Sequence, residues 1–101
     1  MTTFEELNNA VIDWAKARQI IPNGTPSTQL LKAFSEMGEL ADATLKMDTS
    51  EAKDAVGDVM VCLINYCELQ GYSIVECLAL AYNEIKDRKG KLLSTGVFVK
   101  E

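Results

Sequence analysis

Acidic residues at helical spacing are the strongest candidates for chemistry in this chain of 101 residues. Glu36 and Glu39 stand three positions apart, and Asp54 and Asp58 stand four positions apart further along the sequence. Either spacing places both acids of a pair on one face of a helix. The second pair interrupts a largely apolar segment, where a carboxylate is costly unless it is paired or binds a metal ion.

The sequence contains no histidine, which narrows the chemistry that these acids can support. Ser-His-Asp and Cys-His catalysis and metal sites with histidine ligands are excluded within this chain. A group of carboxylate oxygens favours magnesium, manganese or calcium over zinc. A second interpretation stays open: Glu36 and Glu39 lie opposite the apolar stripe of their own helix, and a solvated polar face would explain them without a metal.

Four helices and a tail are predicted to position the acids, because apolar residues recur at helical spacing between capping and stop signals. The helices cover residues 4–19, 26–47, 49–70 and 73–89. The second and third must run antiparallel because their connection is short, so the two acid pairs reach comparable depth. The last eleven residues have no helical period and are predicted to be an extended tail, either packed on a partner or partly disordered.

The predicted fold class is all-α, with one four-helix bundle domain over residues 1–101. The helix over residues 49–70 is apolar almost all round, and such a helix must be buried on most sides. The apolar stripe of the preceding helix consists of Leu30, Phe34, Met37, Ala41 and Leu45. Four helices of one small chain do not provide enough surface to bury all of these apolar residues. We therefore expect oligomerisation to complete the bundle, with both of these helices of each copy in the middle.

Charge and hydropathy exclude several classes of partner. The net charge of −5 argues against nucleic acid, and no run approaches the roughly 20 apolar residues of a membrane span. The N-terminus carries acids where an export signal would be basic. Cys62, Cys67 and Cys77 match no zinc motif and are expected to be reduced and buried, which indicates a cytoplasmic location.

Four segments follow one another in a distinctive order: Gln29 with Lys32, SEMGELAD, DAVGDVMVCLIN and AYNEIKDRKGK. This order resembles the all-α nucleoside triphosphate pyrophosphatase superfamily, and is most similar to small, single-domain MazG-like proteins of bacteria and their viruses. The core signal is an E-x-x-E pair on one helix and an E-x-x-D pair on the next. This chain departs from it at Ala55, where the family usually has Glu, and Asp54 is predicted to act in its place because it shares the face of Asp58.

The resemblance implies a helical homodimer or homotetramer that needs Mg²⁺, with Mn²⁺ as a substitute. Its reaction is hydrolysis of a nucleoside triphosphate between the α and β phosphates, which gives a nucleoside monophosphate and pyrophosphate. Carried onto this chain, it makes Glu36, Glu39 and Asp58 catalytic, and these three with Asp54 hold the metal.

Several further residues are predicted to contact the nucleotide. Positive and polar groups are expected at the outer phosphates, and the resemblance assigns this role to Lys32, Asn83, Lys86 and Arg88. The alternative for the last two is cationic residues that favour a helix C-terminus. Trp14 is a candidate for stacking on the base, with a core tryptophan as the alternative. Asn65 is either a nucleotide ligand or the partner of a buried neighbour.

Two other functions stay open at this point. One is a helical interaction module without catalytic activity, in which the acidic groove binds a basic peptide, and the departure at Ala55 supports it. The other is a pyrophosphohydrolase of the same scaffold that acts on phosphoribosyl-ATP or on a regulatory nucleotide such as ppGpp.

Overall fold

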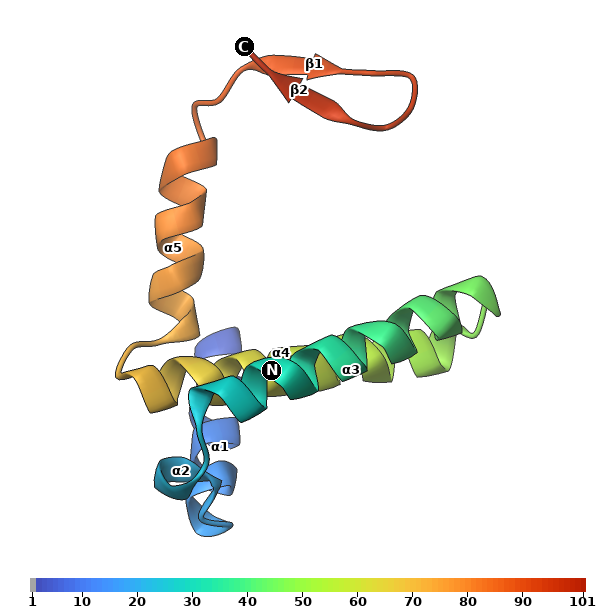
Figure 1. Cartoon of the computed structure of the whole chain (residues 1–101). Coiled ribbons are helices and arrows are strands. Elements are labelled where there is room, and N and C mark those ends of the chain that lie inside the picture. The colour runs from blue at the N-terminus through green and yellow to red at the C-terminus, as the bar shows by residue number, and fades with distance from the viewer. Residues whose placement is uncertain (1) are drawn as a thin grey trace.

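The computed structural model describes residues 2–101 as a succession of helices that ends in a small hairpin (Figure 1). The elements are α1 (Phe4–Ala17), α2 (Ile20–Asn23), α3 (Pro26–Leu45), α4 (Thr49–Gln70), α5 (Ile74–Ile85), β1 (Gly90–Leu92) and β2 (Phe98–Lys100). Helices dominate, which confirms the broad all-α prediction. Two details differ from it: a short turn, α2, interrupts the predicted loop, and the predicted extended tail folds back as two antiparallel strands.

The helix boundaries follow the capping signals in the sequence. Thr3 forms a capping box with Glu6, and the side chain of Asp48 accepts a hydrogen bond from the amide of Glu51. Gly71 ends α4 with φ +88°, a left-handed conformation that glycine adopts without strain. Ser73 caps α5 through the amide of Val75. Local chemistry therefore sets where α1, α4 and α5 begin or end.

Helices α3 and α4 form an antiparallel pair that is the packed centre of the chain (Figure 1). Small residues are prominent among the buried positions of the two helices: Ala33 and Ala43 on α3, and Ala55 and Cys62 on α4, which also buries Ile64 and Asn65. Short side chains allow two helix axes to approach closely. The acids of both helices are therefore held along a narrow seam.

Helix α1 and the turn α2 pack against α4 beside this pair. Ala15 of α1 and Ile21 of α2 are buried, and so is Asn8, with 4% of its surface exposed. Helix α5 packs against the C-terminal end of α4 and projects away from the pair, and it carries the hairpin at its far end (Figure 1). We call α5 and the hairpin together the C-terminal arm.

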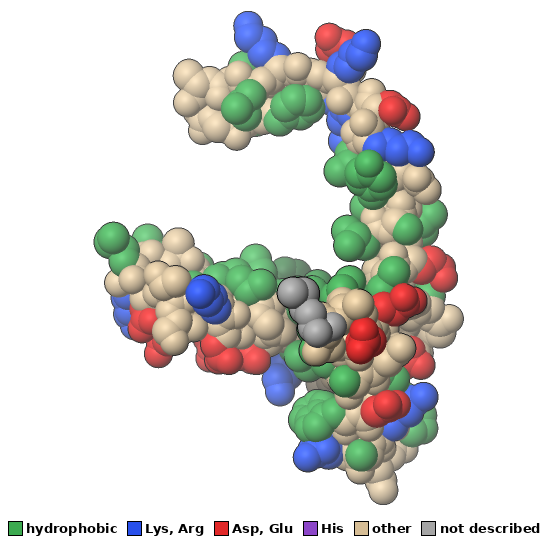
Figure 2. Space-filling model, turned by 180° about the vertical axis from the view of Figure 1, so that it is seen from behind, with side chains coloured by type: hydrophobic (Ala, Val, Ile, Leu, Met, Phe, Trp, Pro, Cys, Tyr) green, Lys and Arg blue, Asp and Glu red, His purple; other side chains and the backbone are tan. Residues whose placement is uncertain are grey.

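The C-terminal arm buries none of its residues among those that the structure describes, although it is rich in large apolar side chains. Its exposed members include Leu78, Leu80, Tyr82, Ile85, Leu92, Val97, Phe98 and Val99. Figure 2 shows hydrophobic side chains on the inner side of the hook that the arm makes with the helix pair. The arm is therefore not folded onto the core of its own chain.

The bundle is not closed within one chain. The accessible surface is 7618 Å², whereas a compact protein of this mass exposes roughly 5,700 Å². The radius of gyration is 16.1 Å, against roughly 13 Å for a compact domain of this length. The whole predicted stripe of α3 is exposed, and the exposed fraction reaches 68% at Phe34 and 83% at Leu45. Oligomerisation itself stays a prediction.

The lengths and apolar content of the described helices decide whether any of them could cross a membrane. Residues 2–101 contain no helix with the length and apolar content needed to cross a bilayer.

Candidate functional site

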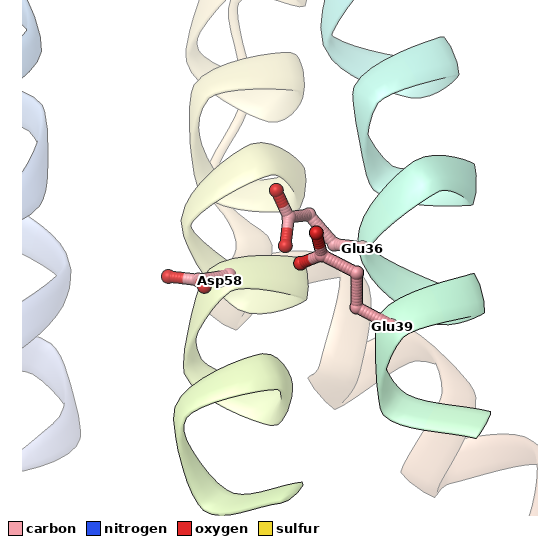
Figure 3. A group of neighbouring side chains, drawn as sticks. All are labelled: Glu36, Glu39 and Asp58. Atoms are coloured by element: carbon pink, nitrogen blue, oxygen red, sulfur yellow. The ribbon is translucent and has the colours of Figure 1, made fainter. Parts of the chain in front are cut away.

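Three carboxylates meet across the seam between α3 and α4. One oxygen each from Glu36, Glu39 and Asp58 lies within 4.8 Å of the other two. Figure 3 shows Glu36 and Glu39 extending from α3 toward the helix that carries Asp58. The turn after α3 makes α3 and α4 antiparallel, and this brings together acids that are far apart in sequence. The arrangement agrees with the prediction that the acids of the two helices lie at comparable depth. We call these three residues the acid cluster.

Glu36 is the most constrained member of the acid cluster. Its Oε2 atom is buried and has no hydrogen-bond partner among the described residues. The pKa of Glu36 is raised above its ordinary value, first by the adjacent side chain of Glu39, then by burial and by the negative charges of Glu39 and Asp58, while the charge of Lys32 lowers it. Glu36 therefore does not belong to a fully solvated polar face, although Glu39 is exposed. A cation would relieve the accumulated charge.

Asp54, the predicted fourth ligand, lies outside the acid cluster. It is exposed and stands one turn before Asp58 on α4. It lines a neighbouring cavity of about 320 Å³ together with Glu39, Asp42, Glu51 and Ala55. Glu39 therefore belongs to the acid cluster and also lines this neighbouring cavity. A contribution from Asp54 to a metal site stays a prediction. Ala55 is 5% exposed and forms part of the wall of this cavity.

A second cavity, of about 230 Å³, opens on the other side of the acid cluster. Its lining comes from four helices and consists of Trp14, Ile20, Gln29, Lys32, Glu36, Asp58, Val61, Cys62 and Asn65. We call it the side cavity. It places Lys32, a predicted substrate ligand, beside two of the acids. The side cavity is thus amphipathic, with charge at the acid cluster and apolar or amide groups elsewhere.

Trp14 borders the side cavity rather than filling a core. Its surface is 43% exposed within one chain, so the alternative of a core tryptophan is wrong for the isolated chain. The guanidinium carbon of Arg18 lies 4.9 Å from the centre of the indole ring, a cation–π contact. Arg18 is a positive group near the site that the sequence patterns did not single out.

The predicted substrate ligands on the C-terminal arm do not reach the acid cluster of their own chain. Asn83 and Lys86 are exposed at the end of α5, and Arg88 follows in the connection to the hairpin. Arg88 lines a surface depression formed entirely by the arm, with neighbours that include Asp87 and Glu101. Their predicted role therefore requires a second copy of the chain.

The sequence leaves two roles open for Asn65, and the surroundings of its side chain in the structure bear on the choice between them. It is 2% exposed, and its Oδ1 atom has no hydrogen-bond partner within residues 2–101. It stands seven positions after Asp58, so both side chains lie on one face of α4. Gln29 stands seven positions before Glu36 on α3 in the same way. The spacing was readable from the sequence, whereas the common cavity was not.

Cys62 also lines the side cavity, where its buried side chain lies near two carboxylates. Burial is the main reason why the pKa of its thiol is raised, and the nearby charges of Glu36 and Asp58 add to the effect while Lys32 opposes it. A raised pKa keeps the thiol neutral, and this disfavours a role as nucleophile or metal ligand.

Comparisons with known proteins relate this chain to a bacteriophage protein. The chain is 30% identical over 64 residues to an uncharacterized 18.2 kDa protein in the rep-hol intergenic region of Haemophilus phage HP1. The match covers 63% of this chain and 39% of that phage protein, so the chain spans less than half of its relative. No family model matches the chain, and no solved structure matches it.

Proposed function

We propose that this chain is a magnesium-dependent pyrophosphohydrolase of nucleoside triphosphates. The observation that carries the proposal is the acid cluster, in which Glu36, Glu39 and Asp58 converge from two helices beside a cavity that contains Lys32 and Trp14. The order of these residues in the sequence supports it through the resemblance to the all-α nucleoside triphosphate pyrophosphatases. Neither argument depends on the phage relative.

The residues fit a hard divalent cation. Carboxylate oxygens are the ligands that Mg²⁺ prefers, and the buried Oε2 of Glu36 lacks any other partner within the described residues. Glu36, Glu39 and Asp58 would hold the ion, and Asp54 would support it from the next turn of α4. When bound, Mg²⁺ supplies positive charge for phosphate oxygens and lowers the pKa of a water molecule.

The chemistry assigned to the chain itself is positioning and proton handling. Water attacks the α-phosphorus, the bond from that phosphorus to the bridging oxygen breaks, and pyrophosphate leaves with the electron pair. A carboxylate of the acid cluster takes the proton of the attacking water. Lys32, beside Glu36 and Asp58, attracts the negative charge of the phosphates. No covalent intermediate is required.

A homodimer or homotetramer is part of the proposal. The chain exposes about 1,900 Å² more than a compact protein of its mass would, and obligate dimers bury on the order of 1,000–2,500 Å² on each partner. A second copy that covers the exposed stripe of α3 and the C-terminal arm would account for this excess. It would also allow Asn83, Lys86 and Arg88 of one copy to approach the acid cluster of the other.

Release of pyrophosphate tests the proposal directly. The assay uses standard and modified nucleoside triphosphates, phosphoribosyl-ATP and ppGpp, each with Mg²⁺, with Mn²⁺ and with EDTA. We expect turnover with at least one triphosphate that EDTA abolishes, and loss of turnover in Glu39→Gln and Asp58→Asn with unchanged helical content by circular dichroism.

Asp42→Asn is the matched control, because Asp42 is an exposed acid on α3 that pairs with Lys46 at 3.0 Å and lies outside the acid cluster. Its turnover should stay close to that of the unmodified chain. Absence of pyrophosphate from every compound would favour the interaction module instead.

A further inference from the structure

We propose that the side cavity holds the nucleobase of the substrate, and that the carboxamide of Asn65 hydrogen-bonds to the edge of that base. The inference rests on the proposed function, since it names the part of the nucleotide that lies beyond the acid cluster. It is carried by the burial and the missing partner of Asn65, which the hydrolytic step itself does not use.

A buried amide oxygen without a partner costs free energy. Asn65 is 2% exposed, and its Oδ1 lacks a hydrogen-bond donor throughout the described part of the chain. Leaving such a group unsatisfied costs about 1–3 kcal/mol. A ligand that brings an N–H group into the side cavity would satisfy it. Nucleobases carry N–H donors and acceptors on the edges that asparagine and glutamine amides recognise.

A second carboxamide lies at comparable depth on the opposite helix. Asn65 follows Asp58 by seven residues, and Gln29 precedes Glu36 by seven residues. Because α3 and α4 are antiparallel, both steps lead the same way from the acid cluster, each by roughly 10 Å along its helix. Both amides line the side cavity. This separation can be spanned by a sugar and its base together, with phosphates at the acid cluster and the far edge of the base at the amides.

The dimensions and the walls of the side cavity also suit a single base. Its volume of about 230 Å³ is below the roughly 300–1,000 Å³ typical of pockets that enclose a whole drug-sized ligand. Trp14 supplies an indole ring on the wall, and aromatic rings stack on any base. Ile20 and Val61 are apolar neighbours. The site therefore combines a stacking surface with amide groups for the edge of the base.

Asn8 provides a matched control within the chain. It too is a buried asparagine, 4% exposed, whose Oδ1 has no partner among residues 2–101. It is not among the residues that line the side cavity. Replacement of either asparagine by leucine, which has a similar shape, removes an unsatisfied polar group, but only Asn65→Leu should affect a ligand.

Tryptophan fluorescence offers a direct measurement, because Trp14 is the single tryptophan of the sequence. The full chain is titrated with AMP, GMP, CMP, UMP and TMP, and with inorganic tripolyphosphate plus Mg²⁺, with correction for nucleotide absorbance. We expect at least one nucleotide to quench Trp14, whereas tripolyphosphate does not. Asn65→Leu should weaken that nucleotide about tenfold, and Asn8→Leu should leave its affinity unchanged.

Stability separates a ligand role from a structural one. If Asn65 serves a ligand, Asn65→Leu keeps or raises the Tm of the free protein while it weakens binding, whereas loss of a structural hydrogen bond would lower Tm. Should Asn65→Leu fail to fold, Gln29→Leu provides the same binding test at a less buried position. The base site is refuted if no nucleotide alters Trp14 fluorescence, or if the folded leucine variant binds every nucleotide as tightly as the unmodified chain.

The two proposals fail in different ways. Pyrophosphate release that is indifferent to the base and to Asn65→Leu would leave the hydrolase standing and remove the base site. Quenching of Trp14 that depends on Asn65, without pyrophosphate release from any triphosphate, would support the base site and remove the hydrolase.

Discussion

The α3–α4 pair and the C-terminal arm are both rich in apolar residues, yet they use them in opposite ways. The pair packs through alanines and a cysteine, such as Ala33, Ala55 and Cys62, and holds the acid cluster on its seam. The arm carries large residues such as Leu80 and Phe98, most of which are exposed and none of which is buried among those described. Small residues suit contact between two helices of one chain, whereas an array of large exposed residues suits contact with another surface.

This difference indicates that the helix pair and the C-terminal arm have separate roles, the first in forming the acid cluster and the second in contacting another surface. The pair can build its part of the site alone, because its geometry depends on close helix packing and a short turn. The arm cannot complete a core alone, and the cations it carries lie away from the acid cluster. The comparison can be tested by perturbing each region and asking whether the other responds.

The largest effect is expected from Glu36→Gln in the α3–α4 pair. Loss of a ligand carboxylate should reduce turnover by more than about a hundredfold. The metal-free protein should nevertheless keep its stability at neutral pH. Folding disfavours the charged form of Glu36, because the pKa of this residue is raised in the folded chain. Above that pKa the carboxylate therefore lowers stability, and the neutral glutamine removes its repulsion with Glu39.

Turnover and the Tm in EDTA provide the two readouts for Glu36→Gln. The matched control is Asp42→Asn, which should change neither by much because exposed ion pairs contribute little. A variant with full turnover would show that the acid cluster is not the reactive centre.

A smaller effect, about tenfold in the dissociation constant of the oligomer, is expected from Leu78→Asp on the arm. Leu78 is 58% exposed in the single chain, and a substitution at such a position in a true monomer changes stability by roughly 0.5 kcal/mol or less. If a second copy covers the arm, the new carboxylate is buried and unpaired, so the complex dissociates.

Sedimentation velocity over a range of concentrations measures the association, with Glu76→Gln on the same helix as the control. Turnover should fall in parallel if Asn83, Lys86 and Arg88 act in the neighbouring copy. A monomeric unmodified chain at micromolar concentration would remove both expectations.

Restoring the acid that the resemblance expects at position 55 should also strengthen metal binding. Ala55 is buried but borders the cavity of about 320 Å³ that Glu39 and Asp54 line, so a longer side chain has space to enter it. We expect Ala55→Glu to tighten Mg²⁺ binding severalfold, since affinity rises with the number of carboxylate ligands. Calorimetry of Mg²⁺ binding tests this, and Ala55→Gln controls for size. Equal affinity in both variants would show that position 55 does not face the ion.

Sequence patterns predicted the α3–α4 pair well because the determinants are local. Asp48 fixes the start of α4, the short turn enforces the antiparallel pairing, and the spacing of the acids then follows. The patterns placed Phe34 and Met37 on a packing surface that a single chain leaves exposed, because periodicity identifies an apolar face but not the partner that covers it. The side cavity was missed for a related reason: Trp14, Gln29 and Asn65 line one cavity only because tertiary packing brings their three helices together.

The junction of the two regions offers a chemical probe, because Cys67 of α4 lies beside Cys77 of α5 with 4.0 Å between the sulfur atoms. Burial first, and then the hydrogen bond with Cys77, raise the pKa of Cys67 to about 11. The thiolate is the reactive form, so a pKa of about 11 reduces the thiolate fraction at pH 8 roughly a hundredfold relative to that of an ordinary thiol. We expect alkylation of Cys67 by iodoacetamide to be slow at pH 8 and to accelerate only as the pH approaches its pKa. Peptide mass spectrometry measures the rate at each cysteine, with Cys62, buried on the side cavity, as the internal reference. If Cys67 reacts rapidly while Cys62 stays protected, the arm swings away from α4 in solution, and its rigid attachment to the helix pair can no longer be assumed.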